Sequence, residues 1–252
     1  MNWRISYRYQ MWDLFKSVRV YYAVIVALLL ALLVSTLSIA SIGEGTFSSL
    51  DMASLIFLFV GGLCSIKEPF GMMLQNGVSR REFFQAKLIT AGSIAFCMAA
   101  VDLLLLLILR GIVSSITDRI QCITMLDQLY ESWGSGQPFL SLYAFLFLFD
   151  FCLYASFFLF GSLISLIFYR LNKLGKTLVG AGTPVFFCIL LPLADQAWTG
   201  GRITGWMIET LGTITGIFQN NPWYMIVTAT VCTIVYACGI WLLLRKAVLK
   251  KA

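Results

Sequence analysis

Two carboxylates lie inside long apolar segments, where ionisable side chains are rare. Asp102 lies within the apolar run 100–105, and Asp150 is flanked by Phe149 and Phe151. A carboxylate at the centre of a bilayer costs about 2.5–3.5 kcal/mol on insertion scales, so its presence there calls for a reason. One interpretation is an acidic lining for cationic or amphipathic cargo. The alternative is that each is protonated or capped by a neighbour such as Tyr154 or Ser156.

Other catalytic or metal-binding chemistry finds little support in the residue types. The chain has no His, which removes the commonest general base and metal ligand. Its seven Cys residues are odd in number and lack the spacing of a zinc or disulfide framework. Residues 174–177 match the end of a phosphate-binding loop, but Arg170 stands where that loop needs its first Gly. We therefore expect no enzyme activity, no metal site and no cofactor held by this chain.

The loop 67–87 is the strongest local feature. Pro69 and Gly71 end an apolar segment, Asn76-Gly77 predicts a turn, and Ser79 followed by Glu82 is a capping box that starts the next helix. We expect the apolar residues of this loop to be exposed beyond the membrane and to fit a partner's socket: Phe70, Met72, Met73 and Leu74. The alternative is an interfacial helix that lies on lipid.

The elements that must position these residues are membrane spans. Of 252 residues, 60% are hydrophobic and 12% charged, with a mean hydropathy of +0.87. Such a composition excludes a soluble globule, a disordered chain and a nucleic-acid-binding module. It predicts an all-α polytopic membrane protein with six spans. These are Tyr21–Ile42, Leu50–Ile66, Leu88–Ile112, a span within Phe139–Tyr169, Thr177–Ala194 and Trp223–Leu244.

Charge and periodicity orient the spans and define the ends of the chain. All Lys and Arg residues except Arg110, Arg119 and Arg202 fall on one side, which predicts a plasma-membrane protein with both termini in the cytoplasm. Residues 1–20 show an apolar stripe that predicts an amphipathic helix lying in the inner interface and then turning into the first span. Residues 21–252 form a single domain, in which 198–221 is expected to be an external or re-entrant helix.

The string from Gly77 to Lys87 resembles the G-x-S-R-x-x-[FY]-x-x-x-K loop of permease subunits in type-2 (ABCG-like) ATP-binding-cassette exporters. The order of elements resembles that family along nearly the whole chain. The resemblance implies a pair of permeases, as two copies or with a paralogue, each bound to a cytosolic subunit that holds ATP and Mg. The residues it implies for that contact are Glu68, Pro69, Phe70, Gly71, Met72, Met73, Gln75, Asn76, Gly77, Ser79, Arg80, Arg81 and Glu82, with a second contact at 170–176.

The resemblance also implies a central cleft lined by the second and fifth spans. Its candidate residues are Phe57, Val60, Phe186 and Phe187, with Asp102 and Asp150 adding charge. For compact bacterial members, the implied cargo is an antimicrobial or cytolytic peptide, handled for export or self-immunity. A hydrophobic drug or a lipid is the next candidate cargo.

The rival function is an ATP-independent channel, scaffold or sensor. The expected partners also include membrane lipid but no nucleic acid.

Overall fold

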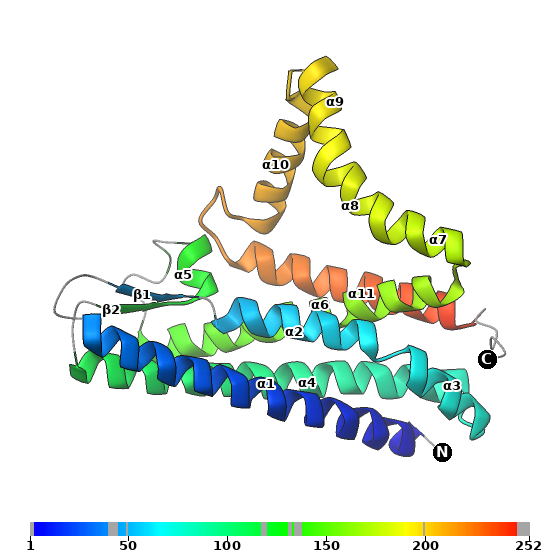
Figure 1. The fold of residues 1–252 in the computed structure, drawn as a ribbon, viewed down its shortest axis with the longest axis horizontal. Coiled ribbons are helices and arrows are strands. Elements are labelled where there is room, and N and C mark those ends of the chain that lie inside the picture. Colours follow the sequence, from blue (N-terminus) through cyan, green and yellow to red (C-terminus); the bar gives the residue numbers. More distant parts are fainter. Residues whose placement is uncertain are drawn as a thin grey trace.

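The computed structural model describes residues 3–39, 45–48, 50–116, 120–130, 133, 138–198 and 200–245. A bundle of long helices dominates it: α1 (Trp3–Ile39), α2 (Leu50–Cys64), α4 (Arg80–Ile116), α6 (Phe139–Arg170) and α11 (Trp223–Arg245) (Figure 1). Five segments of the described chain are long and apolar enough to cross a membrane. These are Trp3–Ala31, Leu50–Gln75, Arg80–Ser115, Phe139–Arg170 and Trp223–Arg245. The prediction of an all-α polytopic membrane protein is thereby confirmed, whereas the count of six spans is not.

Helix α1 differs from the predicted entry into the membrane. We expected a surface helix over residues 1–20 that turns into the first span near Val20, but α1 continues as one helix from Trp3 to Ile39. Of its apolar stripe, Met11, Leu14 and Val18 are buried, Trp3 and Tyr7 are half-buried, and Phe15 is exposed. The helix packs along α4, where the Tyr7 hydroxyl donates a 3.1 Å hydrogen bond to Ser93 Oγ. Periodicity identified Met11, Leu14 and Val18 as members of one apolar face, but these residues are covered by protein in the structure.

The predicted fifth span is helical throughout, but it is irregular. It comprises α7 (Lys173–Thr177), α8 (Thr183–Val185) and α9 (Leu191–Trp198), separated by π-helical turns at Leu178–Gly182 and Phe186–Leu190. Pro184 lacks an amide donor, which accounts for the local loss of regular α-helical bonding. Because the turns divide the segment, no α-helical piece reaches the length of a span. The segment rises away from the bundle (Figure 1).

Helix α10 (Arg202–Thr215) falls inside the predicted helical segment 198–221 and returns from α9 toward α11 (Figure 1). The buried Asp195 carboxylate holds its first turn by accepting from the amides of Ile203, at 3.1 Å, and Thr204, at 2.8 Å. The Thr204 hydroxyl donates to the same carboxylate. An acidic group at a helix start satisfies amides that lack partners within the helix. The hairpin of α9 and α10 is therefore fixed locally.

One end of the bundle carries a small cap. Strand β1 (Gly45–Ser48) pairs in parallel with β2 (Ile120–Ile123), with Gly45 opposite Ile120. A capping box at Thr124 and Asp127 starts the short α5 (Met125–Leu129). Arg110 forms a 3.0 Å ion pair with Asp127, with both side chains about one-third exposed. These contacts tie the connection between α1 and α2 to the one between α4 and α6.

The opposite end holds α3 (Lys67–Gln75), where α1 begins and α11 ends (Figure 1). The Arg80 guanidinium donates a 2.7 Å hydrogen bond to the Arg245 carbonyl oxygen, so the start of α4 and the end of α11 are in contact. The topology therefore brings the predicted coupling loop and the predicted cytoplasmic ends together. Within the bundle, α2 and α6 approach most closely at Gly62 and Gly161, whose backbones are in direct contact.

Candidate functional site

Helix α3 is anchored to the bundle by its aromatic side. Phe70 is fully buried and meets the Phe83 ring edge to face at a centroid distance of 5.3 Å. It also contacts Tyr169 of α6, at 5.8 Å. Aromatic pairs at these distances add stabilisation beyond that of their buried area. The short helix is therefore attached to both α4 and α6.

The expectation that Phe70 and Met73 are exposed is wrong, because both are buried inside the protein. A nine-residue helix needs an apolar face to hold it against the bundle, and these residues supply that face. Pro69 and Val78 are also buried. The face left for a partner consists of Met72, Gln75, Asn76, Gly77, Ser79, Arg80 and Arg81, with Gly71 and Glu82 half-buried. The side chain of Glu68 lies outside the described part of the chain.

The predicted capping box is present at the start of α4. The Glu82 carboxylate accepts from the Ser79 amide at 3.1 Å, and the Glu82 amide donates to Ser79 Oγ at 3.2 Å. Gly77 has a φ of +79°, a conformation that favours glycine. Gly77 and Ser79 of the string thus have a direct structural explanation: one permits the turn and the other starts the helix.

Lys87 completes the attachment in a way that the sequence did not indicate. Its side chain is fully buried, and its ammonium group lies 4.6 Å from the centre of the Phe158 ring. The ammonium also donates to the Ser65 hydroxyl and to the Ser65 carbonyl oxygen, the latter at 3.3 Å. Ser65 lies between the end of α2 and the start of α3. Lys87 therefore holds the chain at the junction between α2 and α3.

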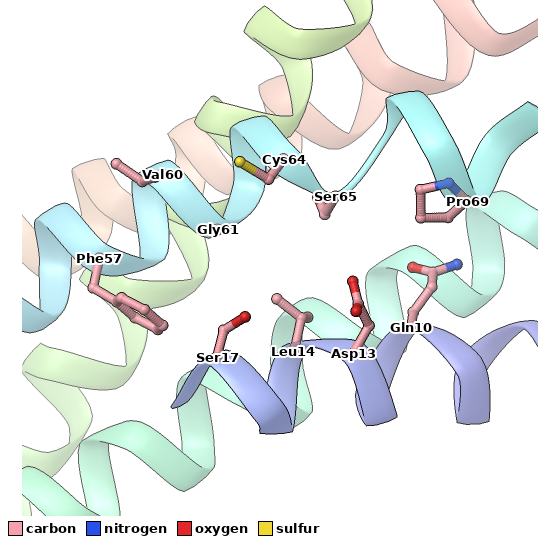
Figure 2. Close-up of a pocket in the computed structure, with 10 residues that line it drawn as sticks. All are labelled: Gln10, Asp13, Leu14, Ser17, Phe57, Val60, Gly61, Cys64, Ser65 and Pro69. Atoms are coloured by element: carbon pink, nitrogen blue, oxygen red, sulfur yellow. The ribbon is translucent and has the colours of Figure 1, made fainter. Parts of the chain in front are cut away.

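A cavity of about 140 Å³ opens beside this junction, between α1 and α2 (Figure 2). Its α1 side carries the polar groups Gln10, Asp13 and Ser17, together with Leu14. The opposite side is formed by Phe57, Val60, Gly61 and Cys64 of α2, with Ser65 and Pro69 beyond the end of that helix. Sequence reasoning singled out Phe57 and Val60 but missed the polar side. The available signal was Gln10, a polar residue next to the apolar stripe of α1.

The structure brings together only some of the predicted path residues. Phe57 and Val60 share the cavity of Figure 2, where the Phe57 ring stacks on Tyr21 at 4.4 Å. Phe186 lies on the segment that rises away from the bundle and is 50% exposed. The side chain of Phe187 lies outside the described part of the chain. The described residues of the fifth predicted span therefore do not line the cavity that holds Phe57 and Val60.

Asp102 and Asp150 are both buried within the bundle. The Asp102 carboxylate accepts hydrogen bonds from the hydroxyls of Tyr22, at 2.8 Å, and Tyr154, at 2.6 Å. Asp150 lies on α6, within electrostatic range of Asp102 and of the buried Asp51. Neither Asp102 nor Asp150 lines the cavity of Figure 2. For Asp102, the geometry matches the capped alternative with Tyr154.

Asp51, in the first turn of α2, is a buried carboxylate that the sequence analysis did not identify. Its carboxylate accepts a 3.0 Å hydrogen bond from the Met125 amide at the start of α5. It thereby connects the second span to the cap. No group of three or more Cys, Asp or Glu residues suited to a metal ion occurs in the described parts of the chain.

Comparison with known proteins identifies no relative. No family model, curated protein or solved structure matches the chain.

Proposed function

We propose that the chain is the membrane-spanning permease subunit of an ATP-driven exporter, moved by a separate cytosolic ATP-binding subunit. The observation that carries the proposal is the attachment of α3. A coupling helix transmits force only if it is fixed to the spans, and α3 is fixed through Phe70, Phe83 and Tyr169. Its other face, including Met72, remains accessible to a partner. This arrangement suits a helix pushed by another protein.

The proposal includes a second permease copy or a close paralogue beside this one. It rests on the resemblance and on the apolar segment that stands away from the bundle. Leu178, Phe186 and Leu193 of that segment are 71%, 50% and 64% exposed. Such a surface requires lipid or protein around it. We propose that it faces the second permease and helps to enclose the central cleft.

The proposed cargo is an amphipathic antimicrobial or cytolytic peptide that is moved out of the membrane or the cytoplasm by alternating access. The Phe-rich spans suit a molecule that enters from the lipid phase. A hydrophobic drug or a lipid is the alternative cargo for the same machine.

Substitution at the accessible face of α3 tests the proposal. The chain is purified with its ATP-binding subunit, and ATP hydrolysis is measured with and without cargo peptide in vesicles. Met72→Asp places a charge in the proposed socket and is expected to abolish both co-purification and stimulated hydrolysis. Leu140→Asp makes the same change at an 81% exposed residue at the start of α6 and is expected to leave both intact.

A chain that co-purifies with no ATP-binding protein, or that moves peptide without ATP, would instead favour the channel or sensor. Equal effects of Met72→Asp and Leu140→Asp would remove α3 as the docking site. The melting temperature of each variant shows whether lost coupling merely reflects lost folding.

A further inference from the structure

The cavity of Figure 2 contains an unsatisfied hydrogen-bond acceptor. Gln10 is 3% exposed, and its Nε2 donates a 3.1 Å hydrogen bond to Ser6 Oγ. Its Oε1 is buried and has no hydrogen-bond partner. Buried amide oxygens are nearly always bonded, so an unbonded one beside a cavity marks a place where a donor fits. In Figure 2 the Gln10 amide lies at the α1 side of the cavity, near Asp13.

The neighbouring polar groups make the site selective for a positively charged donor. Asp13 follows Gln10 by three residues and Ser17 follows Asp13 by four, so all three lie along one face of α1. Asp13 forms no ion pair within the described part of the chain. A carboxylate, an amide oxygen and a hydroxyl can all accept hydrogen bonds, and an ammonium group offers three donors.

The opposite side of the cavity is suited to methylene groups. Phe57, Val60, Gly61 and Cys64 of α2 give the cavity a largely apolar lining. In Figure 2, Phe57 lies across from Ser17, whereas Ser65 and Pro69 lie across from Asp13 and Gln10. A lysine side chain has both required parts, because an apolar stem carries a compact ammonium group. A cavity of about 140 Å³ has room for such a side chain but not for a folded peptide.

A second cavity lies next to the first. It measures about 470 Å³ and shares Asp13 and Cys64 with the first. Its other lining residues are Leu63, Ser165, Phe168, Tyr169 and Lys176. Lys176 is on the same side of the membrane as Asp13 by prediction, but the two form no ion pair in the described structure. The larger space can hold the residues on either side of an inserted lysine.

We propose that the α1–α2 cavity binds the lysine side chain of an amphipathic cargo peptide, with the ammonium group held by Gln10 Oε1 and the Asp13 carboxylate. The proposal rests on the exporter function and names its substrate class. A peptide fits better than an aminophospholipid because a phospholipid would bring a phosphate next to its ammonium. None of the described residues lining the first cavity is basic, and the Asp13 carboxylate would repel a phosphate there. Lys176 of the second cavity is the basic residue that a lipid phosphate would need to reach, and the lipid measurement below distinguishes the two ligands.

The test is a binding measurement that needs no ATP-binding subunit. The chain is placed in phosphatidylcholine nanodiscs and titrated with a fluorescent amphipathic helical peptide carrying one lysine. Acetylation of that lysine is expected to weaken binding by about tenfold, because it removes the charge recognised by Asp13. Gln10→Leu and Asp13→Asn are each expected to weaken binding of the unmodified peptide by a similar factor, and to have little effect on the acetylated one.

Two matched variants serve as controls. Gln85→Leu makes the Gln10 change on an exposed residue of α4, and Glu209→Gln neutralises an exposed carboxylate on α10. Both are expected to bind the peptide as the unaltered chain does. Equal binding of both peptides by the unaltered chain, or undiminished binding by Gln10→Leu and Asp13→Asn, overturns the proposal.

A second measurement distinguishes a peptide lysine from a phospholipid headgroup as the source of the bound ammonium. Replacing part of the phosphatidylcholine by phosphatidylethanolamine is expected to leave the peptide affinity unchanged. A tenfold loss would show that the headgroup occupies the site and would overturn the assignment to peptide. If the peptide lysine is not bound while Met72→Asp still uncouples ATP hydrolysis, the lysine-binding proposal is rejected and the exporter function is kept. If lysine binding holds while no ATP-binding subunit associates, the exporter function falls.

Discussion

The closest helix contact in the bundle allows a quantitative test of the fold. An alanine at Gly62 of α2 would place its Cβ in overlap with the Phe158 carbonyl oxygen, and one at Gly161 of α6 would overlap the Phe59 carbonyl oxygen. Both obstacles are backbone atoms, which cannot rotate away as a side chain can. The two helices would have to separate, and filling a close-packed contact in this way costs about 1–3 kcal/mol.

The same substitution at Gly92 provides the reference. A Cβ at Gly92, in the middle of α4, meets nothing within 4 Å. Alanine stabilises a helix by about 0.5–1 kcal/mol relative to glycine, and this gain applies at both positions. The difference between Gly62→Ala and Gly92→Ala therefore isolates the overlap. At about 2–4 °C per kcal/mol for a chain of this size, the Tm of Gly62→Ala should lie about 2–12 °C below that of Gly92→Ala.

The assay is thermal unfolding of the detergent-solubilised protein, followed by the amount that remains monodisperse after heating. Gly62→Ala and Gly161→Ala are both expected to lower the melting temperature by forcing α2 and α6 apart. The double variant should therefore lose less stability than the sum of the two single losses. Equal melting temperatures for Gly62→Ala and Gly92→Ala would refute the close approach of α2 and α6. Additive losses would show that the two glycines act at separate contacts.

Three further substitutions test other parts of the structure. Phe70→Ala should cost about 3–5 kcal/mol and release α3, so trypsin should cleave at Arg80 under conditions that leave the unaltered chain intact; unchanged cleavage would contradict the anchoring role. Asp195→Ala should cost about 0.5–2 kcal/mol, and hydrogen exchange should quicken at the first amides of α10 but not in α11. Burial raises the pKa of Tyr130 to about 12, so the folded chain keeps a proton that the unfolded chain loses near pH 10. Stability should therefore fall from about pH 10 to pH 12 in the unaltered chain, and this loss should be smaller in Tyr130→Phe; parallel pH profiles would contradict it.

The sequence predicted features that depend on local chemistry. The capping box of Ser79 and Glu82 is determined by two side chains and the amides next to them, and it is present as predicted. Helix α10 follows from a weak amphipathic pattern within 198–221. The burial of Met11, Leu14 and Val18 was likewise visible as a stripe on α1.

Features that depend on distant partners could not be predicted. An apolar stripe shows that a face is covered, but it does not show whether lipid or protein covers it, so α1 was assigned to the membrane interface. Phe70 was assigned to a partner for the same reason, although Phe83 and Tyr169 cover it. Gln10 and Asp13 line a cavity only because α2 packs opposite them, and this packing is not visible in the sequence of α1.

The parallel pairing of β1 with β2 constrains the order in which the protein assembles. Each strand follows a helix that runs toward the capped end and precedes one that runs back, so the chain direction makes the two strands parallel. Helices α2, α3 and α4 all lie between the strands in the sequence, in the position of a crossover connection. During synthesis, β1 therefore waits without its partner until the third long helix has been inserted. The strands can pair only after the chain has been made as far as Ile123, so their pairing reports that the first half of the chain has reached its final topology.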